Sequence, residues 1–194
     1  MKRGMTWLVA VATMAGFGLA GIGLTAPASA QTLAAAATSV APYCGIYWGS
    51  LPKTADPHGA GLLTNIRAGQ HPCFDRLVFD LDGREAGYRV QYVDAVVADG
   101  SGAPVPLRGD AFLQIIFPAT IVDENGHASY TAPNPSEAVD VTGWRTFRQV
   151  AQAGAFEGQV TVGLGVRARL PFRVLTLDGP GGNSRVVVDV AHRW

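Results

Sequence analysis

Ser50 and Lys53 have the spacing of a serine nucleophile and the lysine base that takes its proton. That chemistry needs a helical turn to bring the lysine against the hydroxyl, but Pro52 lies inside the tetrapeptide and disfavours a helix. The companion motifs S-D-N and K-T-G are absent, and Lys2 and Lys53 are the only lysines of the chain. A chance match of four residues is the simpler interpretation.

Other catalytic and metal-binding patterns are missing from the sequence. His71 and Asp75 are four residues apart, which on a helix would turn both toward a metal, but Pro72 follows His71 directly. There is no H-E-x-x-H zinc pattern and no G-x-S-x-G elbow, and the glycine-rich segment 179–182 precedes a strand-like run, unlike a phosphate loop. We therefore expect no catalytic residues, no metal site and no cofactor, and a protein that is not an enzyme.

Aromatic, basic and acidic side chains near the two cysteines are the candidates for ligand binding. Aromatic rings stack on sugar faces, and Arg and Asp form hydrogen bonds with hydroxyls and carboxylates. Two alternatives stay open: the rings around Cys44 pack as a small satellite core, and the Arg and Asp side chains form a salt-bridged loop anchor. The binding candidates are Trp48, Ser50, Lys53, Arg67, His71, Asp75 and Arg76.

The first residues of the chain have the pattern of an export signal. Lys2 and Arg3 precede an uncharged stretch rich in Ala, Gly, Val and Leu, and Ala28-Ser29-Ala30 matches the small-residue cleavage pattern. We expect residues 1–30 to be a signal peptide, 31–42 a flexible linker and 43–194 one folded domain. An uncleaved membrane anchor is the alternative, since about 20 apolar residues can span a bilayer.

Charge and cysteine content limit the partners and the compartment. The 194 residues carry 15 basic and 15 acidic side chains, and loss of Lys2 and Arg3 would leave a slightly acidic protein. The sequence lacks the stripe of basic residues that is typical of nucleic-acid binding, so we expect no nucleic-acid partner. After signal cleavage we also expect no membrane span. Cys44 and Cys73 are the only cysteines, so in an exported protein they are expected to form a disulfide.

The pattern of short apolar runs and turns along the chain predicts an all-β fold. Short apolar or alternating runs cover 77–81, 88–97, 111–117, 159–166, 172–177 and 185–190, and Gly- and Pro-containing turns separate them. Pro118 is expected to end its run, and Asn125-Gly126 is a hairpin signal. Residues 146–152 fit a strand or a single helical turn equally well. We predict an antiparallel β-sandwich of two packed sheets with at most one short helix.

Two of the expected strands resemble each other. Arg76 and Asp80 have the spacing of Arg185 and Asp189, and each pair encloses three apolar residues. In a strand, residues four apart point to the same face. The repeat indicates either simple strands with polar ends or two related strands in symmetric positions of two packed sheets.

A set of segments carries a family resemblance, and together they extend over nearly all of the chain from Tyr43 to Val190. The segments are 44–53, 67–80, 87–93, 156–158, 171–174 and 185–189. In these segments the chain resembles the AMIN-like domain of secreted actinobacterial proteins, and it is more distantly similar to the AMIN domain that localises cell-wall amidases. The resemblance implies a β-sandwich and binding to peptidoglycan or another envelope component.

Two functions follow as expectations. The first is a secreted, non-catalytic domain of the cell envelope that binds peptidoglycan or another wall glycan. The second is a secreted enzyme or enzyme inhibitor that acts on envelope components with an unrecognised site. Because the charge is balanced, binding would depend on shaped contacts from Arg and aromatic residues rather than on bulk charge.

Overall fold

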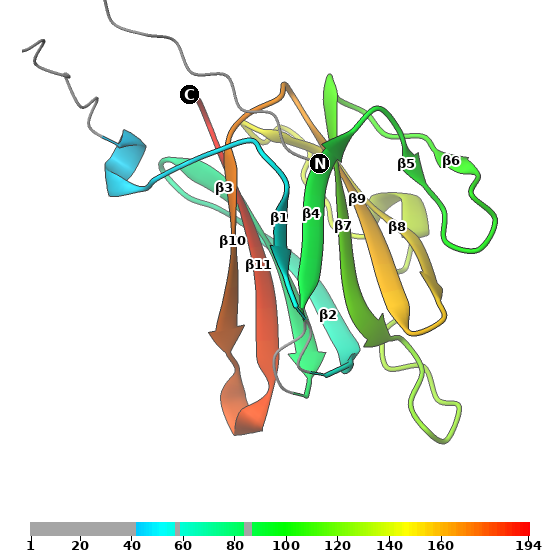
Figure 1. Ribbon diagram of the computed structural model, residues 1–194. Helices are drawn as coiled ribbons and strands as arrows, with labels where there is room; N and C mark the ends of the chain where they lie inside the picture. The colour runs from blue at the N-terminus through cyan, green and yellow to red at the C-terminus, as the bar shows by residue number, and fades with distance from the viewer. Residues whose placement is uncertain (1–41, 57–58, 84–86) are drawn as a thin grey trace, which may run out of the picture. The chain divides into compact units, whose positions relative to one another are not determined.

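The computed structural model describes residues 42–56, 59–83 and 87–194 (Figure 1). The expected signal peptide and nearly all of the expected linker therefore lie outside the described residues. The described part consists of strands and three single 3-10 turns, without an α-helix. The elements are η1 (Tyr43–Gly45), β1 (Lys53–Ala55), β2 (Gly61–Gln70), β3 (Phe74–Asp82), β4 (Tyr88–Val93), β5 (Val96–Val97), β6 (Pro104–Val105), β7 (Ala111–Thr120), η2 (Pro135–Glu137), β8 (Phe147–Phe156), β9 (Gln159–Val166), β10 (Phe172–Asp178), η3 (Pro180–Gly182) and β11 (Ser184–Ala191).

The long strands form two antiparallel arms that are joined into one sheet. The first arm has the order β2-β3-β11-β10, and the second has the order β1-β4-β7-β9-β8 (Figure 1). The end of β7 pairs in parallel with the start of β2, which connects the arms. At the opposite side, the amide of Phe172 in β10 donates to the carbonyl of Gly49, just before β1, over 2.8 Å.

Because of these two links, the expected architecture is confirmed in its class but not in its detail. The all-β class is confirmed, but two separate packed sheets are not, because the strands run through a nearly closed, barrel-like sheet. The small pair β5-β6 is a second sheet. Among the described residues, no helix has the length and apolar character needed to cross a bilayer.

Alternating side chains fill the space between the two arms. In β7, Leu113, Ile115 and Phe117 are fully buried, while the residues between them are only partly covered. The ring of Phe117 meets that of Phe79 from β3 at a centroid distance of 4.8 Å. This period of two places one face of each arm in a common core, as strand geometry requires.

Three β-bulges, one in β2 and two in β8, explain where the sequence pattern was least informative. A bulge between Leu63 and Asn65 breaks the alternation of β2, which the sequence did not predict as a strand. Register shifts at 147–149 and 152–154 similarly disturb β8, and the ambiguous segment 146–152 belongs to this strand. Each bulge adds a residue on one side only, so a strict period of two is lost.

Three smaller expectations need correction. Strand β7 continues through Pro118 to Thr120, because Pro118 lies opposite the end of β9, where β7 changes partner to β2. The run 88–97 is divided by a bend at residues 94–95 into β4 and β5. The turn at Gly126 forms, but it closes a single bridge between Val122 and Ala128.

The repeated Arg–Asp strands lie side by side. They are β3 and β11 of the same arm, paired antiparallel with Arg76 opposite Asp189 and Arg185 opposite Asp80. Symmetric positions in two different sheets were therefore the wrong interpretation. The expected common face of Arg and Asp is confirmed, because each Arg now meets the Asp of the other strand.

Asp75 is a buried anchor for the first arm. Its side chain is fully buried, and one carboxylate oxygen accepts the amides of Thr146 and Phe147 at 2.8 and 3.0 Å. The other oxygen lies 3.0 Å from Nε2 of His192. The carboxylate therefore links β3 to the start of β8 and to the end of the chain.

We predict that Asp75→Ala lowers the free energy of unfolding by about 3–5 kcal/mol, because it leaves buried donors without an acceptor. Urea denaturation followed by circular dichroism measures the change. Asp82→Ala, on an exposed position of the same strand, is the control and should cost about 0.5 kcal/mol or less. Equal losses in the two variants would contradict the anchoring role.

The disulfide between Cys44 and Cys73 is present, as expected. It connects the segment before β1 to the residue before β3 across 29 positions. We predict that replacing both cysteines with serine lowers the free energy of unfolding by about 3–4 kcal/mol, the loop-closure value for this length. Denaturant titrations of the variant and of the oxidised parent measure it, and coincident transitions would contradict the prediction.

Candidate functional site

The outer side of the first arm carries four arginines and two aspartates. In β3, Leu77, Phe79 and Leu81 face the core, so the alternate residues of that strand face outward. The same alternation in β11 turns its charged residues to the same side. We call this surface the arginine face, and it consists of Arg67, Arg76, Asp80, Arg173, Arg185 and Asp189.

Each aspartate of the arginine face is bracketed by two arginines from neighbouring strands. Asp80 accepts from Nε and Nη2 of Arg67, at 2.7 and 3.0 Å, and from Nε of Arg185 at 3.0 Å. Asp189 accepts from Nε and Nη2 of Arg76, at 2.6 and 2.9 Å, and from Nε of Arg173 at 2.8 Å. The two clusters follow the local two-fold relation between β3 and β11.

The arginine face is positively charged, and many of its guanidinium N–H groups do not bond to the two aspartates. The hydrogen bond from Arg67 lowers the pKa of Asp80, so its carboxylate is ionised at neutral pH. The hydrogen bond to Asp189 likewise raises the pKa of Arg76. Four arginines against two aspartates leave two positive charges in excess. The carboxylate bonds use fewer than half of the guanidinium N–H donors.

Exposure differs between the two clusters. The side chain of Asp189 is fully buried, whereas that of Asp80 is 23% exposed and that of Arg67 is 47% exposed. Val78 and Val187 lie between the clusters and are buried, although they are outside the main core. The aliphatic parts of arginine side chains commonly cover apolar surface in this way.

Aromatic rings border the Asp189 end of the arginine face. The guanidinium carbon of Arg173 lies 5.5 Å from the ring centroid of Trp48 and 5.3 Å from that of Phe74. His71 stacks on Phe74 at a ring-centroid distance of 4.5 Å. Trp48 and His71 are half-buried, so these rings both pack beside the disulfide and reach the surface.

The structure separates the predicted site residues into three groups. Trp48, His71 and Arg76 meet around Phe74, and Arg67 lies at the other end of the same face. Asp75 is buried and does not reach this surface. Ser50 and Lys53 lie elsewhere: the carbonyl of Ser50 accepts from Arg169, and the ammonium of Lys53 is 4.7 Å above the ring of Phe172.

The serine–lysine tetrapeptide does not form the helical turn that would bring the lysine against the hydroxyl. Lys53 begins the extended strand β1, and residues 50–53 contain no helical turn. Among the residues that the structure describes, no three His, Cys, Asp or Glu side chains gather as metal ligands.

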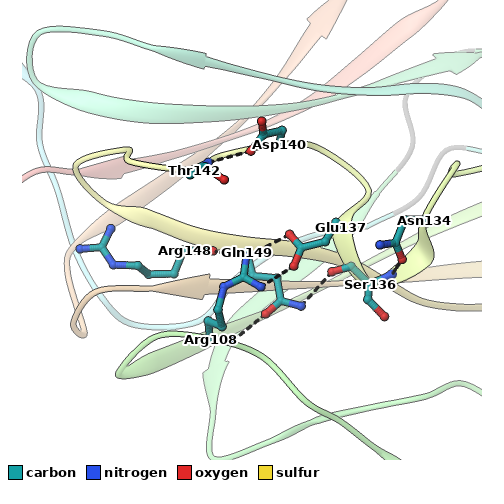
Figure 2. Close-up of polar contacts among 8 residues, drawn as sticks. All are labelled: Arg108, Asn134, Ser136, Glu137, Asp140, Thr142, Arg148 and Gln149. Atoms are coloured by element: carbon teal, nitrogen blue, oxygen red, sulfur yellow. Dashed lines mark hydrogen bonds and ion pairs between the residues drawn. The ribbon is translucent and has the colours of Figure 1, made fainter.

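A cleft beside β8 was not found by sequence reasoning. Its volume is about 700 Å³, and its lining includes Arg108, Glu137, Asp140, Trp144 and Arg148. The guanidinium of Arg108 forms a bidentate pair with Glu137, 29 residues further along the chain (Figure 2). Only the fold brings these residues together, and no local motif marks them.

Several residues of the arginine face were also missed as site residues. Arg173 has no sequence signal of its own. Asp80, Arg185 and Asp189 belong to the Arg–Asp repeat, which was the available signal, because a repeated charge pattern on two strands predicts a common face.

Comparison with known families adds to this geometry. A family model, the AMIN-like domain, matches residues 61–192, from the first residue of β2 to His192. The match includes both Arg–Asp strands and all residues of the cleft. No curated protein and no solved structure matches the chain. Because the matched segment is more than half of the sequence, the chain belongs to the AMIN-like domain family.

Proposed function

We propose that this protein is an exported, non-catalytic domain of the cell envelope that binds peptidoglycan or another wall glycan through the arginine face. Family membership supports an association with the cell wall. The observation that carries the proposal is the pair of Asp-centred arginine clusters on one strand face, with half-buried rings at one end.

The arginine face has the chemistry for an acidic, hydroxyl-rich ligand. Guanidinium groups bind carboxylates through two parallel hydrogen bonds, and wall polymers carry carboxylates on their peptides and sugar acids. The aspartates hold the arginines in place, so less side-chain entropy is lost when a ligand binds. Trp48 and His71 supply flat surfaces for sugar rings at the same face.

The location of the charge matters more than its total. The chain as a whole is neutral, yet the arginine face has an excess of two positive charges. Attraction is therefore local to this surface, and a moderate rise in salt should weaken binding without abolishing it.

Export is supported by the disulfide, because such bonds persist in oxidising compartments.

The non-catalytic role is supported by the placement of the candidate reactive residues. His71 stacks on Phe74, Asp75 is buried, and Lys53 lies over Phe172 on a strand. Within the ranges 42–56, 59–83 and 87–194, we find no contact that favours the alternative of an enzyme or enzyme inhibitor.

Co-sedimentation of the purified full-length chain with peptidoglycan sacculi tests the proposal, with cellulose and arabinogalactan as comparison polymers. We predict that Arg67→Gln/Arg185→Gln weakens binding roughly tenfold or more, since charge-assisted hydrogen bonds are lost. Asp80 is partly exposed, so its carboxylate remains hydrated in this variant and the fold is expected to persist.

Arg89→Gln/Arg145→Gln is the matched control, because it removes the same charge from exposed positions outside the arginine face. Its binding should equal that of the parent. The proposal fails if the parent stays in the supernatant at low and moderate salt, or if both double variants lose binding equally.

A further inference from the structure

The cleft beside β8 is lined by residues between Glu137 and Arg148 and by Arg108, which lies 29 positions before Glu137 in the chain. Arg108 comes from the segment before β7, and Glu137 comes from η2. Trp144 lies in the loop before β8, and Arg148 lies at the start of β8. The loop is held against β8 by the amide of Ala138, which donates to the carbonyl of Val150 over 2.8 Å. The cleft is thus built by tertiary contacts.

The Arg108 side of the cleft is fixed by Gln149. This buried side chain accepts the amide of Arg108 at 2.7 Å and donates to the carbonyl of Ser136 at 2.8 Å (Figure 2). A Cβ atom at Gly165 would overlap the carbonyl oxygen of Arg108, so glycine permits this close approach. Arg108 and η2 are therefore positioned from the core side.

The opposite side of the cleft is equally constrained. Nη1 of Arg148 donates to the carbonyls of Trp144 and Phe147 at 2.8 and 3.0 Å. The indole of Trp144 stacks on Phe147 at an interplanar angle of 12°. Asp140 accepts the amide of Thr142 at 2.9 Å, which orders the loop between them. A ligand would meet a preformed surface.

The chemistry of this lining differs from that of the arginine face. Two arginines are balanced by Glu137 and Asp140, so the charged side chains of the cleft sum to zero. Donors and acceptors are both available, and Trp144 adds an apolar plane. Neighbouring hydroxyls of a pyranose ring both donate and accept, while its C–H face packs on an aromatic ring. The volume lies in the range of about 300–1,000 Å³ that small-molecule sites occupy.

We propose that this cleft is a second binding site that takes an uncharged pyranose unit of an oligosaccharide. A polyanion gains no net attraction here, since the lining has no charge excess. The site is independent of the arginine face, so either proposal can fail alone.

Titration of the full-length ¹⁵N-labelled chain with the neutral trisaccharide chitotriose tests this inference, and cellotriose tests whether other pyranoses fit. We expect amide shifts in residues 134–149 and in Arg108. Asp140→Asn, at an exposed position, should weaken binding several-fold, and Trp144→Ala should weaken it tenfold or more.

The matched controls are Asp178→Asn and Trp194→Ala, which make the same changes at exposed positions that do not line the cleft. Both should bind chitotriose as the parent does. Asp140→Asn keeps the test valid if Trp144→Ala does not fold. The inference is overturned if neither trisaccharide shifts these amides, if folded cleft variants bind as the parent does, or if an acidic peptide binds at the cleft in preference to the sugars.

Discussion

The pairing of β3 with β11 is the constraint on which the first arm depends. Its register sets Arg76 opposite Asp189 and Arg185 opposite Asp80, across more than 100 residues of sequence. A slip by one residue would turn these charges into the core and expose the leucines, phenylalanine and valines that fill it. Hydrophobic alternation and charge pairing therefore specify the same register.

The same register joins stability to the candidate binding surface. Asp189 is fully buried, so it depends on both of its arginines, and removing either would leave an under-compensated charge. Asp80 is more accessible, and its arginines are the more exposed pair. The ion pairs at the Asp189 end are therefore the more costly to disturb, and those at the Asp80 end can exchange contacts with a ligand at a lower cost in stability.

Much of the fold was predictable, because alternation is a local signal. The strand at 159–166 shows it in sequence, the strands at 74–82, 172–178 and 184–191 were marked by short runs of β-forming residues, and the disulfide follows from cysteine number and export. Strand β2 was missed because a bulge interrupts its alternation. The near-closure of the sheet depends on the pairing of β2 with β7 and on the Gly49–Phe172 bridge, which no local pattern encodes.

The candidate site residues were predictable only where they cluster in sequence, as around Cys73. The Arg108–Glu137 pair was not predictable, because only the tertiary fold brings these two residues together.

We propose that the arginines of the first arm contact a wall glycan directly. Nuclear magnetic resonance of the arginine Nε–Hε groups, recorded on the full-length chain during titration with soluble peptidoglycan fragments, tests it most directly. If they do, saturable shifts are expected for Arg67 and Arg185, with smaller shifts for Arg76 and Arg173, whose carboxylate partner is buried. Binding that leaves all four signals unchanged, or that moves only arginines outside this face, would contradict it.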